Sequence, residues 1–243
     1  MTEVTSPEAG IQPMSLPARI AGVVMSPRQT FAAVAAHPKS LGVLLVTIVA
    51  SAAITFWFQS TETGQKAVTD AIEQQIQLVE RLTGNSVPDE QYDAMMAGAA
   101  RAPYQSAIAI VVSFPLLTAV FAGILLGVFN GVLGGAAKFR QVFAIVAHSG
   151  VVWTLVTVIS VLMGFIRGDA TGATRLSAFV PGLEDGFVAS LLGYIDLLWL
   201  WGFFSLAVGV AVLYRRRTGP IALTFIGLYL VVGILYAGVA SMF

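Results

Sequence analysis

Five apolar stretches, each long enough to cross a lipid bilayer, constrain this chain more than any other feature. A helix that rises 1.5 Å per residue needs about 20 mostly apolar residues to cross roughly 30 Å of hydrocarbon. The stretches are Leu41–Phe58, Ile108–Leu133, Val142–Ile166, Ile195–Tyr214 and Ile221–Phe243. Each is apolar on every side, as expected of a helix surrounded by lipid. The pattern predicts an all-α fold, a polytopic integral membrane helical bundle with five transmembrane helices.

The composition excludes a water-soluble globular protein. Of the 243 residues, 57% are hydrophobic and 11% are charged, against roughly 45–50% and 25% in soluble domains. Because the chain has no cysteine and only two histidines, disulfides, thiolate chemistry and a cysteine or imidazole metal cage are excluded. The net charge is zero and the cations are scattered, so nucleic acid is not an expected partner. We expect no metal and no other cofactor.

Basic residues mark alternate connections between the apolar stretches. Those connections carry Arg19, Arg28 and Lys39, then Lys138 and Arg140, then Arg215, Arg216 and Arg217. The other connections, including 167–193, are acidic overall. Because short cytoplasmic loops are enriched in Lys and Arg, we expect a multi-pass protein of the cell inner (cytoplasmic) membrane. Its N-terminus is then cytoplasmic and its C-terminus extracytoplasmic.

Residues 1–40 are predicted to form a cytosolic N-terminal tail that carries an amphipathic surface helix. Ser26 can cap this helix and Pro27 can occupy its first turn, and the helix is expected to run to His37. Phe31 and Val34 share one face, while Arg28 points away from it. Such a helix lies flat on the membrane or packs on the cytosolic ends of the spans; the sequence leaves both open.

Residues 41–243 are predicted to form the five-span domain, with an extracytoplasmic helical hairpin at 59–105. An apolar stripe in its first helix comprises Val68, Ile72, Ile76 and Val79, at helical spacing. Gly84 is expected to end this helix, and a second is expected to begin near Ser86. The stripe either is buried against the second helix or docks another extracytoplasmic protein.

Small residues recur at every fourth position of the second span. Gly123, Gly127, Gly131 and Gly135 form this row. Helices in lipid associate through close backbone approach at such small residues, so the row predicts tight helix packing. The packing partner is another span of the same chain or a second copy.

Three polar residues are predicted to lie inside the membrane. Asp196 is expected near the outer interface, with a water or a Trp, Tyr or backbone partner, where it positions a helix or takes a functional role. His148 and Asn130 lie at similar depth in neighbouring spans, so a hydrogen bond between them is predicted.

These residues form no recognisable catalytic constellation. The only near match to a membrane serine protease motif is the segment Ala147 to Gly150, and the second histidine, His37, lies outside the spans. Only one acidic residue lies in a span, whereas an aspartyl protease needs two. We therefore expect no enzymatic activity. A carrier usually has paired repeats, and five spans do not divide into two halves, so transport stays an unsupported alternative.

The order of motifs along the chain, from Leu16 onward, resembles the Yip domain of Ypt/Rab-interacting membrane proteins, in its bacterial branch. The resemblance rests on three segments: Ser26-Pro27-Arg28-Gln29-Thr30-Phe31 followed by Pro38; Gly131 to Arg140; and Tyr194-Ile195-Asp196-Leu197 followed by Trp199 to Trp201. His148 and Ser149 depart from the pattern, so the resemblance gives them no role.

The resemblance implies a non-enzymatic membrane protein. Eukaryotic relatives act in vesicle trafficking with Rab GTPases and as membrane scaffolds, and some bacterial relatives are associated with ABC-type exporters. We therefore expect an accessory or scaffold subunit that binds lipid and other membrane proteins, such as an ABC exporter subunit or a trafficking partner, or that associates with itself. The alternative is a small-solute channel or carrier.

Overall fold

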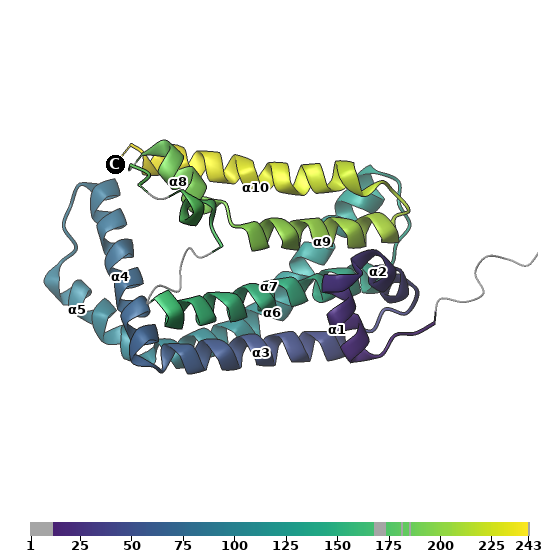
Figure 1. The fold of residues 1–243 in the computed structure, drawn as a ribbon, viewed down its shortest axis with the longest axis horizontal. Helices are drawn as coiled ribbons and strands as arrows, with labels where there is room; N and C mark the ends of the chain where they lie inside the picture. The colour runs from purple at the N-terminus through teal and green to yellow at the C-terminus, as the bar shows by residue number, and fades with distance from the viewer. Residues whose placement is uncertain (1–11, 168–173, 181, 185, 243) are drawn as a thin grey trace, which may run out of the picture. The chain divides into compact units, whose positions relative to one another are not determined.

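The computed structural model describes residues 12–167, 174–180, 182–184 and 186–242, which are predominantly helical (Figure 1). The elements in chain order are α1 (Leu16–Met25), α2 (Pro27–Ala36), α3 (Leu41–Gln59), α4 (Glu62–Thr83), α5 (Asp89–Gly98), η1 (Ala99–Arg101), α6 (Ala102–Leu126), η2 (Gly127–Val132), α7 (Phe139–Arg167), η3 (Leu176–Phe179), α8 (Phe187–Tyr194), α9 (Leu197–Leu213) and α10 (Thr218–Ala240). Within the described residues, β pairing is limited to one isolated bridge. The all-α prediction is confirmed.

Among the described residues, four helical segments are long and apolar enough to cross a membrane. They are α3, the continuous segment Asp89–Val132 that contains α6, the segment Phe139–Ile166 of α7, and α10. The predicted span Ile195–Tyr214 corresponds to α9, which is equally apolar but has only 17 residues. Its length of about 25 Å falls short of the roughly 30 Å of hydrocarbon. The multi-pass prediction is confirmed, and the length criterion alone does not establish the count of five.

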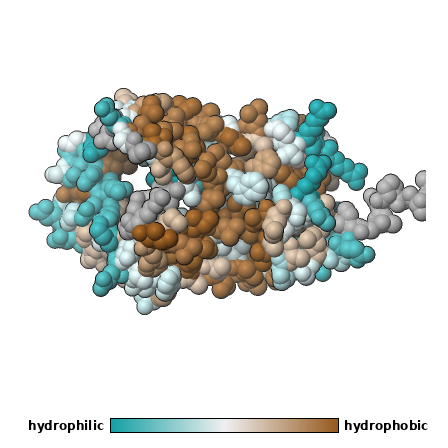
Figure 2. Space-filling view, viewed as in Figure 1, coloured by the Kyte–Doolittle hydropathy of each residue, from teal (hydrophilic) through white to brown (hydrophobic). Residues whose placement is uncertain are grey.

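The exposed surface of the long helices is apolar. Of the most apolar window in the segment containing α6, only 17% is buried, against 56% for α7. Leu116, Val120 and Ile124 are among the exposed side chains of α6. Figure 2 shows apolar residues gathered over the long helices and hydrophilic residues gathered over α4 and α5. Because an exposed face of this composition requires an apolar solvent, the long helices contact lipid.

The chain divides into two compact units. The first comprises Met1–Thr47, Pro115–Trp153 and Trp201–Ile226; the second comprises Ile48–Phe114, Thr154–Leu200 and Gly227–Phe243. Each of α3, α6, α7, α9 and α10 has residues in both units.

In the first unit, α1 and α2 form a pair of short helices. Ser15 caps α1 by accepting a hydrogen bond from the Ala18 amide at 3.4 Å, and α2 begins at Pro27 as predicted. The Ser26 side chain makes no capping bond, contrary to prediction. Gly22 of α1 lies directly against Thr30 of α2, so the helices cross closely there. The helix α1 itself was not expected from the sequence.

The apolar face of α2 is buried in the first unit. Phe31 and Val34 are 0% exposed, and the ring of Phe31 lies beside Gly209 of α9. The side chain of Gln141, from α7, donates to the Ala35 carbonyl at 3.1 Å. Of the two alternatives for this helix, packing on the spans is therefore the one the structure shows. The face expected to lie on the membrane surface is not available to lipid.

In the second unit, α4 and α5 form the predicted hairpin. Thr61 caps α4 by accepting from the Gly64 amide at 3.1 Å, and Gly84 ends it in the left-handed region with φ 70°. In the predicted apolar stripe, Ile76 is buried, whereas Val79 is exposed. Helix α4 contacts both α5 and η1. The stripe is thus partly buried within the hairpin and partly open.

The connection 167–193 contains two short helices in the second unit. Residues 168–173, 181 and 185 of this predicted loop lie outside the described residues. The remainder forms η3 and α8, which contact each other. Beside them, the amide of Leu176 donates to the Ile195 carbonyl at 2.9 Å, and the amide of Leu197 donates to the Thr174 carbonyl at 3.0 Å.

Candidate functional site

The glycine row lies in the first unit on a face that no described part of the chain covers. Gly123, Gly127 and Gly131 are exposed, and a methyl group added at any of them would have no neighbouring heavy atom within 4 Å. Gly135 differs, because a methyl group there would lie 2.6 Å from the ring of Tyr214. Of the four predicted packing residues, only Gly135 meets a side chain of another described segment, that of Tyr214 directly after α9.

Other glycines of the spans do have a side chain of another helix packed against them. An added methyl group would lie 2.6 Å from Ile145 at Gly209, 3.1 Å from Trp153 at Gly202, and 2.6 Å from Tyr194 at Gly233. Each of these glycines lets a side chain from another helix lie directly on its backbone. The Gly123–Gly127–Gly131 face is the same kind of surface without the side chain.

Asn130 closes the connection between α6 and α7. Its side-chain amide donates to the Ala137 carbonyl at 2.8 Å, and its side-chain oxygen accepts from the Ala137 amide at 3.3 Å. The predicted hydrogen bond from Asn130 to His148 is wrong. The side chain of Asn130 instead satisfies the backbone of a turn that follows η2.

His148 is fully buried in the first unit and contacts an arginine. Its Nε2 lies 3.2 Å from the Arg19 guanidinium, and its Nδ1 lies 2.7 Å from the Ala144 carbonyl. Because a guanidinium can only donate, Nε2 must accept, and the ring proton on Nδ1 is donated to Ala144. The contact therefore requires a neutral imidazole and ties α1 to α7.

Sequence reasoning did not identify Arg19 as a site residue. Its side chain is 8% exposed, and it also donates to the Lys39 carbonyl at 2.7 Å. Burial lowers the pKa of its guanidinium. Within the described residues, its Nε is buried without a hydrogen-bond partner. A lone arginine in the otherwise apolar segment Leu16–Met25 was the available signal.

Asp196 caps α9 in the second unit. Its Oδ1 accepts from the amides of Leu198 at 2.8 Å and Trp199 at 3.3 Å, which are the amides that an N-cap satisfies. Its Oδ2 accepts from the Thr174 hydroxyl at 2.6 Å. The described partners of the carboxylate are thus two backbone amides and a threonine hydroxyl, while the Tyr229 hydroxyl accepts from the Asp196 backbone amide at 3.0 Å.

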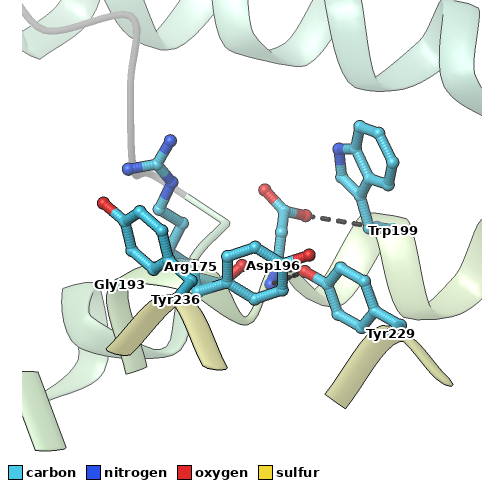
Figure 3. Close-up of a pocket in the computed structure, with 7 residues that line it drawn as sticks. Arg175, Gly193, Asp196, Trp199, Tyr229 and Tyr236 are labelled. Atoms are coloured by element: carbon cyan, nitrogen blue, oxygen red, sulfur yellow. Dashed lines mark hydrogen bonds between the residues drawn. The ribbon is translucent and has the colours of Figure 1, made fainter. Parts of the chain in front are cut away.

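A pocket of about 300 Å³ lies around Asp196 (Figure 3). Its lining includes Arg175, Tyr194, Trp199, Tyr229 and Tyr236. Figure 3 shows Arg175 and Asp196 extending toward the same side, with Trp199 beyond Asp196. Apart from Asp196, sequence reasoning identified none of these as site residues, because they come from α8, α9, α10 and the connection before η3.

The other polar residues considered are potential metal ligands and Ser149. No three His, Cys, Asp or Glu side chains there come together as a metal site. Ser149 is fully buried and donates to the Ile145 carbonyl of its own helix at 3.0 Å.

Comparison with known proteins gives a family but no individual relative. No curated protein and no solved structure matches the chain significantly. The family model of the Yip1 domain matches residues 21–240, from α1 to the end of α10. This match covers nearly all of the helical architecture, including α2, the glycine row and the α8–α9 break, as the motif resemblance implied. The chain therefore belongs to the Yip1 domain family of membrane proteins.

Proposed function

We propose that this protein is a non-enzymatic accessory or scaffold subunit that binds another membrane protein through the Gly123–Gly127–Gly131 face. The partner is a membrane protein such as an ABC-type exporter subunit or a trafficking component, or a second copy of the chain. Helix packing in lipid depends on close backbone approach at small residues. The observation that carries the proposal is that these three glycines are exposed, whereas Gly135, Gly202, Gly209 and Gly233 have side chains against them.

In this proposal the chain crosses the cytoplasmic membrane five times, and its N-terminus lies in the cytoplasm. Besides the four helical segments that are long enough to cross, α9 is apolar along its whole length, which supports a fifth passage. The connections α2–α3, η2–α7 and α9–α10 carry the basic residues Lys39, Lys138 and Arg217. This grouping agrees with the enrichment of Lys and Arg on the cytoplasmic side.

The hairpin α4–α5 gives the partner a second surface. Leu78, Val79 and Leu82 are exposed near the C-terminal end of α4, outside the apolar spans. Single exposed apolar residues need no explanation, but three within five positions of one helix form a small patch. In the proposal, this patch contacts an extracytoplasmic part of the partner.

The test replaces the open glycines and follows association. Gly127→Leu combined with Gly131→Leu fills the face, at two positions where no described heavy atom lies within 4 Å of an added methyl group. The matched control is Gly227→Leu in α10, another span glycine with no heavy atom within 4 Å of an added methyl group. We expect the double variant to fold with unchanged thermal stability and to lose co-purification of its membrane partner or chemical cross-linking to a second copy. The control should keep both.

If the double variant associates as strongly as the wild type, the glycine face is not the interface. Reconstitution into liposomes distinguishes the channel or carrier alternative from the accessory role. Purified protein in liposomes is expected to leave ion and small-solute permeability unchanged. Solute flux that depends on the protein, with no partner present, would establish the alternative instead.

A further inference from the structure

The pocket around Asp196 holds opposite charges that do not neutralise each other. Arg175 and Asp196 face each other in an antiparallel bridge. The hydrogen bonds run between their neighbours, Leu176 to Ile195 and Leu197 to Thr174, so the pair is of the non-hydrogen-bonded kind, in which side chains lie closest. Although both residues are described, their side chains form no ion pair with each other. A positive and a negative pole therefore border one small space.

Aromatic rings form the rest of the pocket wall. The ring centroid of Tyr194 lies 5.0 Å from that of Tyr229 and 5.6 Å from that of Tyr236. Trp199 stacks on Tyr229 at 6.3 Å. The faces of such rings attract ammonium groups, most strongly where water is partly excluded. Beside a carboxylate, this wall is suited to a cation.

The pocket is held in shape by contacts that do not need a ligand. The Tyr229 hydroxyl donates to the Tyr194 carbonyl at 2.8 Å and accepts from the Asp196 amide. Gly233 allows the Tyr194 ring to lie on the backbone of α10. The Asp196 carboxylate is fixed by three donors but has further lone pairs, since two carboxylate oxygens offer about four acceptor positions. A ligand would thus meet a preorganised site.

We propose that this pocket binds a headgroup in which an ammonium is joined to a phosphate, as in phosphoethanolamine. The ammonium lies against Asp196 and the tyrosine faces, and the phosphate lies against Arg175, whose guanidinium can form two parallel bonds to it. A volume of about 300 Å³ is at the lower end for ligand pockets, which fits a headgroup and leaves acyl chains outside. Tyrosine and tryptophan are typical of membrane interfaces, where phosphatidylethanolamine supplies this headgroup. The site shares no residue with the glycine face.

The experiment measures which lipid the full-length protein retains. The protein is placed in nanodiscs of phosphatidylethanolamine and phosphatidylglycerol in equal amounts, and bound lipid is identified by native mass spectrometry. The two lipids share the phosphate, but only the first has an ammonium. We expect the wild type to be enriched in phosphatidylethanolamine. Asp196→Asn should weaken this preference about tenfold, because one charged contact is lost.

Asp196→Asn is a suitable probe because asparagine caps helices as well as aspartate does. Arg175→Gln is the second variant; Arg175 is exposed, so its loss should not unfold the protein, and we expect reduced retention of both phospholipids. Glu184→Gln is the matched control, since Glu184 lies in the same connection but does not line the pocket. It should bind like the wild type.

The lipid and the free headgroup are distinguished in nanodiscs of phosphatidylglycerol alone. Soluble phosphoethanolamine is added and its binding is measured by calorimetry. Binding that Asp196→Asn removes would support the headgroup chemistry and assign a soluble ligand. Retention of phosphatidylethanolamine without such binding would assign the lipid. Equal retention of both lipids by the wild type, together with no binding of the soluble compound, would overturn the proposal.

Discussion

The contact between Arg19 and His148 makes a buried charge depend on a neutral acceptor. The guanidinium is almost completely buried and its described partners are the His148 ring and the Lys39 carbonyl. No carboxylate of the described residues takes part. Burying a charge is costly unless it is hydrogen-bonded, so the imidazole is part of what makes Arg19 tolerable at this position.

Removing either partner should therefore destabilise the protein. We expect His148→Phe to lower stability by about 1–3 kcal/mol, because a buried donor of Arg19 loses its acceptor. Arg19→Met, which keeps much of the apolar stem, should cost a similar amount. Thermal unfolding of both single variants and the double variant measures the coupling. The double variant should be more stable than the sum of the two single losses implies, and strict additivity would show that the contact contributes nothing.

Asp196 has a structural role that can be separated from its charge. It satisfies two free amides at the start of α9. Asp196→Ala should cost about 1 kcal/mol through loss of the cap, while Asp196→Asn should cost much less. The comparison of the two unfolding temperatures checks this. If both variants lose the same stability, the charge and not the capping geometry stabilises this end of α9.

At the scale of elements, the packed glycines decide how helices approach each other in the first unit. Gly209 of α9 allows Phe31 of α2 and Ile145 of α7 to meet the same stretch of backbone. A methyl group there would lie 3.1 Å from the Phe31 ring, which is closer than ordinary van der Waals contact. The position of α2 therefore depends on the absence of a side chain at residue 209.

Gly209→Leu should displace α2. The larger side chain cannot share its space with Phe31, and overpacking of this kind costs about 1–3 kcal/mol or more. We expect faster tryptic cleavage after Arg28, which is exposed on α2, and a lower unfolding temperature. The matched control is Gly227→Leu, at an open position of α10. Cleavage at the wild-type rate in Gly209→Leu would mean that α2 is held by its other contacts.

Some elements of the fold could be predicted from the sequence and others could not. Charge-free apolar length predicted α3, α6, α7 and α10. The turn signals predicted the start of α2 at Pro27 and the end of α4 at Gly84. The helix α1 was missed because ten residues with one arginine resemble a tail. The pocket was missed because Arg175, Tyr229 and Tyr236 meet Asp196 only through the fold. The predicted hydrogen bond between Asn130 and His148 was wrong because two residues at equal depth in the membrane need not be in contact.

For the whole molecule, the number of membrane crossings depends on α9. This helix is apolar throughout, so its 17 residues would expose a large apolar area in water. Its length of about 25 Å leaves a mismatch of roughly 5 Å against the hydrocarbon. Local thinning of the bilayer costs only fractions of a kcal/mol per Å. Crossing therefore costs less free energy than leaving the helix in water, and we expect α9 to cross.

The two possible topologies place the end of the chain on opposite sides, which allows a decisive test. The protein has no cysteine, so single cysteines can be introduced without other changes. With five crossings, an impermeant maleimide added to intact cells should label Glu90→Cys and Ser241→Cys but not Arg217→Cys. All three positions are exposed. If α9 does not cross, Arg217→Cys becomes accessible together with Glu90→Cys, and Ser241→Cys becomes protected. Labelling after cell lysis controls for reactivity, since every variant should then react.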